Sequence, residues 1–177
     1  MTKELIGFDL DGVLYSFHDV FYRELVAHDN LKMGYTEFWK AAEGLWNGDS
    51  KYHNLTRLPH LFTSAVINSD NLRTLWKLSK MYDIIYITKR QPEIHFWTGQ
   101  WLKKSGVPFY ENYLLTDNKL VTVEKAKCGY YVEDRAIEAQ PLSEITTVFM
   151  VRQPWNLNDR NGYTCIDNLQ ELEGILL

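Results

Sequence analysis

Cysteine and long hydrophobic runs are both scarce in this sequence. It has only two cysteines in 177 residues, Cys128 and Cys165, which is too few for a disulfide framework. No cluster at metal-binding spacing surrounds either of them. Because the first residues already enter a strand pattern, we expect neither a signal peptide nor a membrane segment. A reducing, cytoplasmic setting fits this composition.

The sequence also lacks a strong excess of charge of one sign. It has 19 Lys and Arg residues against 23 Asp and Glu residues, for a net charge of −4, and the basic residues are scattered. Proteins that bind duplex nucleic acid usually present a basic patch, so we expect no such partner. With 45% hydrophobic and 24% charged residues, the composition is that of a globular protein.

Predicted strands and helices alternate along most of the chain. Short apolar runs predict five strands, over residues 4–9, 83–88, 113–116, 129–134 and 146–151. Helical patterns begin at Ser69, Pro92, Lys119 and Asp167. Such alternation predicts an α/β fold with a doubly wound, Rossmann-like parallel sheet.

Residues 15–69, called the insert below, interrupt this alternation. They show helical spacing and no strong strand signal, with helices expected near 20–26, over 36–46 and from Pro59. They predict a small helical cap on a core formed by residues 1–14 and 70–177. Most aromatic rings of the insert are expected to form its own core, whereas Trp39 and Trp46 are candidates to stack on a planar ligand.

Two carboxylates, Asp9 and Asp11, stand at the end of the first predicted strand. Side chains two residues apart on a strand share a face, so we expect the two carboxylates to converge. Gly12 allows a sharp turn beside them. Carboxylates next to buried apolar residues are costly unless protons or a cation neutralise them, so the pair predicts a functional site.

Other polar residues stand at comparable positions. Thr88 ends the second predicted strand, and Glu133 and Asp134 end the fourth. Open α/β sheets bind ligands at the carboxyl ends of their strands. We expect Lys119, at the start of a helix, to face these strand ends. Lys125, in the middle of the same helix, is the alternative.

The sequence from 9 to 14, Asp-Leu-Asp-Gly-Val-Leu, resembles the first motif of the haloacid dehalogenase-like (HAD) phosphohydrolases. Thr88, Lys119 and the acidic pair 133–134 resemble the second, third and fourth motifs, with Glu-Asp where Asp-Asp is common. The cap position and the Pro-Trp-Asn sequence at 154–156 are similar to the 5′(3′)-deoxyribonucleotidase branch.

This resemblance implies a phosphomonoester hydrolase that works through an aspartyl-phosphate. Asp9 would attack phosphorus, while Asp11 would protonate the leaving oxygen and later take a proton from water. Thr88 and Lys119 would hold the phosphoryl oxygens.

The resemblance also implies Mg²⁺ as the cofactor, since this ion prefers oxygen ligands. Asp9 and Asp134 would bind it directly together with the Asp11 carbonyl, and Glu133 would orient a metal-bound water.

The implied substrate is a small phosphorylated metabolite, preferably a deoxynucleoside monophosphate. The alternatives are a phosphatase of sugar phosphates or other small metabolites, and a non-catalytic phospho-ligand binding module. The sequence argues against the binding module, because no proposed catalytic position is missing. Lys89 and Arg90 follow Thr88 and could touch substrate, but a surface role is expected for both.

Overall fold

The computed structural model describes the chain except residues 1–2, 30–33, 39–57 and 158–161. Its described residues form one parallel sheet in the order β3-β2-β1-β4-β5-β6. The strands are β1 Leu5–Phe8, β2 Asp83–Thr88, β3 Tyr113–Leu115, β4 Tyr130–Glu133, β5 Thr147–Val151 and β6 Thr164–Ile166. The predicted doubly wound α/β fold is therefore confirmed.

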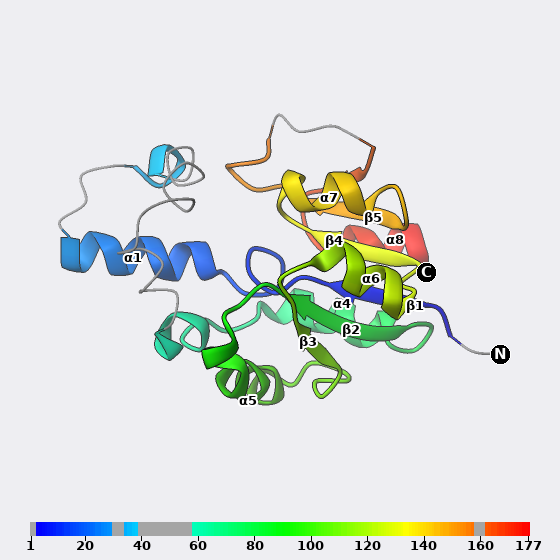
Figure 1. Cartoon of the computed structure of the whole chain (residues 1–177), viewed down its shortest axis with the longest axis horizontal. Coiled ribbons are helices and arrows are strands. Elements are labelled where there is room, and N and C mark those ends of the chain that lie inside the picture. The colour runs from blue at the N-terminus through cyan, green and yellow to red at the C-terminus, as the bar shows by residue number, and fades with distance from the viewer. Residues whose placement is uncertain (1–2, 30–33, 39–57, 158–161) are drawn as a thin grey trace.

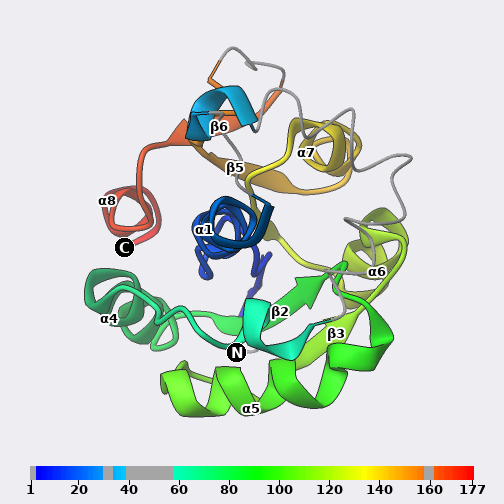
Figure 2. The ribbon, with the colours of Figure 1, turned by 90° about the vertical axis from the view of Figure 1, so that its left-hand side faces the viewer.

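Helices cover both faces of the sheet (Figure 2). They are α1 Phe17–Asp29, α4 Ser69–Leu78, α5 His95–Ser105, α6 Lys119–Ala126, α7 Ala136–Leu142 and α8 Glu171–Leu176, with 3-10 turns η1 Pro59–Phe62 and η2 Pro92–Ile94. Strand side chains alternate between two apolar clusters. Ile84 and Tyr86 of β2 pack with residues of α4, α5 and α8, whereas Ile85 and Ile87 pack with residues of α6 and α7.

The described part of the insert lies beyond the carboxyl ends of the strands. Figure 1 shows α1 extending from that end of the sheet, with the C-terminus at the opposite end. The Phe17 ring stacks on Phe21 and on Phe62, with centroids 5.4 and 4.8 Å apart. These three rings and Phe38 are buried. They belong to the same apolar cluster as Phe8 and Tyr86 of the sheet, so they do not form the separate core that the sequence predicts for the insert. The division into core and cap domains stays a prediction.

Some boundaries and elements differ from the sequence-based expectation. β6 and α7 were not predicted, because β6 is a three-residue edge strand and α7 is short, with Pro141 inside it. The segment from Pro59 is a 3-10 turn rather than a longer helix, and the last helix begins at Glu171 rather than Asp167. Residues 35–38 are helical, but most of the helix expected over 36–46 lies outside the described residues.

Candidate active site

The order of the sheet brings the predicted site residues together. β1 lies between β2 and β4, so the residues that end these strands become neighbours. Thr88 and Glu133 are the last residues of β2 and β4, and Asp9 follows β1 directly. The Asp9 N–H still donates to Val132 O at 2.9 Å, which fixes its backbone against β4.

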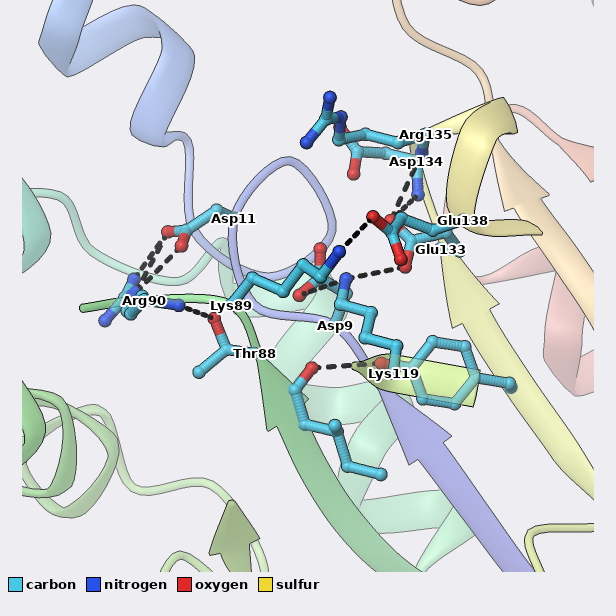
Figure 3. A network of polar contacts seen from close by, with 12 residues as sticks. Asp9, Asp11, Thr88, Lys89, Arg90, Lys119, Glu133, Asp134, Arg135 and Glu138 are labelled. Atoms are coloured by element: carbon cyan, nitrogen blue, oxygen red, sulfur yellow. Dashed lines mark hydrogen bonds and ion pairs between the residues drawn. The ribbon is translucent and has the colours of Figure 1, made fainter. Parts of the chain in front are cut away.

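Three buried carboxylates form a compact cluster at this end of the sheet. Asp9, Glu133 and Asp134 can each offer an oxygen so that these atoms lie within 4.8 Å of one another. Lys119 Nζ lies 3.0 Å from Asp9 Oδ1 and donates to Glu133 Oε2 at 2.7 Å (Figure 3). Lys125, six residues later on α6, is exposed, so Lys119 is the lysine that the fold brings to this cluster.

The three carboxylates of this cluster can carry more negative charge than the Lys119 ammonium neutralises. Burial raises the pKa of Asp9 to about 8, although the Lys119 ammonium lowers it. Burial and the neighbouring Glu133 and Asp9 likewise raise the pKa of Asp134 well above its usual value. Burial alone would raise the pKa of Glu133, but the Lys119 ammonium and several hydrogen bonds bring it below its usual value. The excess negative charge therefore calls for protons or a cation.

The carboxylates of Asp134 and Glu133 differ in their hydrogen-bond partners. Glu133 Oε2 accepts from Lys119, and its Oε1 accepts the backbone N–H groups of Asp134 and Arg135 at 3.1 and 3.2 Å. Neither carboxylate oxygen of Asp134 has a hydrogen-bond partner among the described residues, although both are buried. Burying such a group is costly unless something binds it. This all-oxygen donor set fits a hard divalent cation such as Mg²⁺.

Gly12 lets the loop after β1 approach Asp134 closely. Its φ is +88°, and a Cβ at this position would lie 2.0 Å from Asp134 Oδ2. Gln153 Nε2 donates to Gly12 O at 2.7 Å and helps to hold this loop. Only glycine fits here, for reasons of both space and backbone conformation.

The segment after β5 fixes the backbone of Asp134. The Asn156 side-chain amide donates to Asp134 O at 2.6 Å and to Val151 O at 2.8 Å. Trp155 Nε1 donates to the same Asp134 carbonyl at 3.2 Å. The sequence singled out Pro-Trp-Asn at 154–156 only through resemblance. Its place soon after an apolar strand could have marked Asn156 as a site residue, but this signal does not indicate which groups the side chain binds.

Asp11 faces away from the carboxylate cluster. β1 ends at Phe8, so strand alternation does not extend to Asp11, and the expected convergence with Asp9 is not seen. Figure 3 shows its carboxylate directed at Arg90. Arg90 Nη2 lies 2.6 Å from Asp11 Oδ1, and Nε lies 2.9 Å from Oδ2.

The surface role expected for Arg90 is wrong, because its side chain is fully buried. Lys89 is exposed and donates to Glu138 Oε1 at 2.6 Å, so it lies at the rim of the site. Thr88 is buried, and its Oγ1 accepts from the Arg90 N–H at 3.4 Å. Trp39 and Trp46 lie outside the described residues.

No family model matches the chain. A nucleotidase of Clostridium acetobutylicum is 25% identical over 123 residues, covering 66% of this chain. The chain spans 62% of the length of that curated relative.

Solved structures match nearly the whole chain. A haloacid dehalogenase-like hydrolase of Streptococcus pneumoniae has a TM-score of 0.70 at 11% identity and covers 99% of each chain. YfnB of Bacillus subtilis, in a structure bound to magnesium, has a TM-score of 0.64 at 12% identity, again covering 99% of each chain. Haloacid dehalogenases also have similar structures. These matches confirm the HAD-like fold.

Proposed function

We propose that this chain, which has the fold of the haloacid dehalogenase-like hydrolases, is a Mg²⁺-dependent phosphomonoester hydrolase. The observation that carries the proposal is the buried cluster of Asp9, Glu133 and Asp134, in which both oxygens of Asp134 lack a hydrogen-bond partner among the described residues. Asp9 and Asp134, with the Asp11 carbonyl, would hold the ion, and Glu133 would orient its water. Mg²⁺ would supply positive charge that lets a phosphate dianion approach these carboxylates.

The chain's own residues would carry the two chemical steps. An Asp9 carboxylate oxygen attacks phosphorus, the bond to the ester oxygen breaks, and Asp11 gives that oxygen a proton. A water then attacks the aspartyl-phosphate, Asp11 takes its proton, and phosphate and free Asp9 result. Lys119, already 3.0 Å from Asp9, and the Thr88 hydroxyl hold the phosphoryl oxygens.

A fold shared with dehalogenases does not choose between the two chemistries. The carboxylate cluster favours phosphoryl transfer, because a second and a third buried carboxylate beside the nucleophile would only repel an anionic substrate in the absence of a cation. A divalent cation held by these carboxylates would supply the positive charge that offsets this repulsion.

The proposed substrate class is a nucleoside monophosphate, preferably a deoxynucleotide. The support is the nucleotidase relative at 25% identity and the aromatic residues of the insert, since aromatic rings stack on bases.

The test is a panel of phosphomonoesters ranked by kcat/KM, with Mg²⁺ and after its removal by a chelator. The panel pairs each nucleoside monophosphate with a sugar phosphate of similar size and includes a haloacid. We expect Mg²⁺-dependent phosphate release that is fastest with a nucleotide. Preference for sugar phosphates would reject the nucleotide assignment, and halide release without phosphate release would reject the phosphatase assignment.

A further inference from the structure

We infer that Arg90 is a positioning residue, which holds the Asp11 carboxylate and ties its position to both connections of the insert. The inference rests on the proposed function, in which Asp11 transfers the protons.

The contact between Arg90 and Asp11 is a bidentate ion pair. Arg90 Nη2 and Nε both donate to Oδ1, at 2.6 and 3.1 Å, and Nε also donates to Oδ2 at 2.9 Å. A planar guanidinium that binds both oxygens of a carboxylate fixes its orientation as well as its place. A lysine would keep the charge but could not impose this orientation.

The guanidinium is held in turn by its surroundings. Its Cζ lies 5.0 Å from the Tyr15 ring centroid, 4.9 Å from that of Phe62 and 5.3 Å from that of Trp101. Nη1 donates to Thr98 Oγ1 at 3.3 Å. A side chain with no exposed surface and this many contacts is too constrained to reach a substrate. Arg90 therefore acts through Asp11 rather than directly.

Two of the three rings belong to the connections between the insert and the sheet. Tyr15 opens the insert and Phe62 lies near its end. Tyr15 Oη donates to Leu61 O at 2.5 Å and accepts from Ala65 N at 3.3 Å, which joins the two connections. Trp101 of α5 donates from Nε1 to Ala65 O at 2.9 Å. A shift of the insert would displace the rings around Arg90, and with them Asp11.

The main test compares two leaving groups in the Arg90→Lys protein. An alkyl phosphate such as methyl phosphate needs a proton on its leaving oxygen, whereas p-nitrophenyl phosphate scarcely does. We expect kcat/KM for the alkyl ester to fall roughly 100-fold and that for the nitrophenyl ester to fall much less, since misplacement of a catalytic group by about 1 Å can cost this much. Tyr15→Phe keeps the ring but loses both hydrogen bonds. It should lower the ratio of kcat/KM for the alkyl ester to kcat/KM for the nitrophenyl ester as well, but by less.

Arg152→Lys is the matched control. Arg152 pairs with Asp167 at 2.9 Å on an exposed surface, so its replacement should leave the ratio unchanged. Equal losses on both esters in Arg90→Lys would overturn the inference while leaving the phosphatase function standing. If Arg90→Lys does not fold, the ratio in Tyr15→Phe decides: an unchanged ratio rejects the link.

A second readout does not depend on turnover. A double-mutant cycle of Asp11→Asn and Arg90→Lys, followed by thermal unfolding, should show coupling between the two positions. Wild-type protein that hydrolyses neither ester would reject the proposed function, and this cycle would then judge the contact alone. Additive effects of the two substitutions on thermal stability would reject the coupling between Arg90 and Asp11.

Discussion

Lys119 Nζ lies 3.0 Å from Asp9 Oδ1, so the proposed nucleophile is paired with a buried cation. Burial would lower the pKa of Lys119, but the carboxylates of Asp9 and Glu133 raise it well above its usual value. Lys119 therefore remains charged across the physiological range. A fixed positive charge beside the nucleophile can bind the oxygens of a phosphoryl group that arrives there.

Lys119→Met should lower kcat/KM for any phosphomonoester by roughly 100-fold or more, the usual effect of losing a fixed charge-stabilising donor. Lys125→Met, on the exposed part of the same helix, is the matched control and should keep wild-type activity. Steady-state kinetics on both variants decide between these lysines. Loss of activity in Lys125→Met alone would transfer the role to Lys125.

Gly12→Ala should disturb the site through Asp134. The added Cβ would meet Asp134 Oδ2 at 2.0 Å on a backbone with φ of +88°. Gly106→Ala is the control, because Gly106 has φ of +71° but, among the described residues beyond its chain neighbours, no atom lies within 4 Å of the new Cβ. Both variants carry backbone strain of about 1 to 2 kcal/mol, so both should melt at a lower temperature. Only Gly12→Ala should also lose Mg²⁺ affinity, and equal Mg²⁺ affinity in the two would contradict this account.

The two acids at the end of β4 should differ in their effect on the metal. Asp134→Ala should weaken Mg²⁺ binding more than Glu133→Ala, because neither Asp134 oxygen has a hydrogen-bond partner among the described residues, whereas Glu133 is already hydrogen-bonded. Calorimetric Mg²⁺ titration of both variants measures the difference. A larger loss in Glu133→Ala would exchange the two roles.

The stability of the metal-free protein should fall as pH rises. In the unfolded chain Asp9 and Asp134 ionise at about pH 4. In the folded protein the pKa of Asp9 is about 8 and that of Asp134 is raised well above its usual value. Between these values the folded protein binds more protons, so the free energy of unfolding decreases with rising pH.

Mg²⁺ that replaces these protons should therefore raise the melting temperature more at about pH 8 than at about pH 5. Asp9→Asn, which cannot ionise, should show a shallower decrease in the metal-free state. Thermal melts across this range, with chelator and with Mg²⁺, test the expectation. A metal-free protein that becomes more stable toward pH 8 would contradict it.

The sequence was sufficient to predict the residues that stand at strand ends. Thr88 and Glu133 end apolar runs, and the parallel sheet brings such ends together whatever the details of packing. Lys119 lies near the same edge because it is the first residue of α6, which follows the end of β3 and runs back toward the start of β4.

Arg90 could not be predicted in the same way. Its partners Asp11, Tyr15 and Phe62 lie far from it in the chain, and an arginine in a loop is usually exposed. Only the path of the insert back to the sheet creates the buried space that it fills. For Asp11, the strand alternation was extended past the last residue of β1, which is why its direction was mispredicted.

The most direct test of the central claim is the detection of phosphate on Asp9. Asp11→Asn protein, in which hydrolysis of the intermediate should be slow, is mixed with p-nitrophenyl phosphate and Mg²⁺, quenched in acid and analysed by peptide mass spectrometry. The account predicts a phosphate adduct on Asp9 that is absent with chelator and absent when Asp9 is replaced by Asn. Release of p-nitrophenol with no adduct on Asp9, or turnover by a folded Asp9→Asn protein, would contradict it.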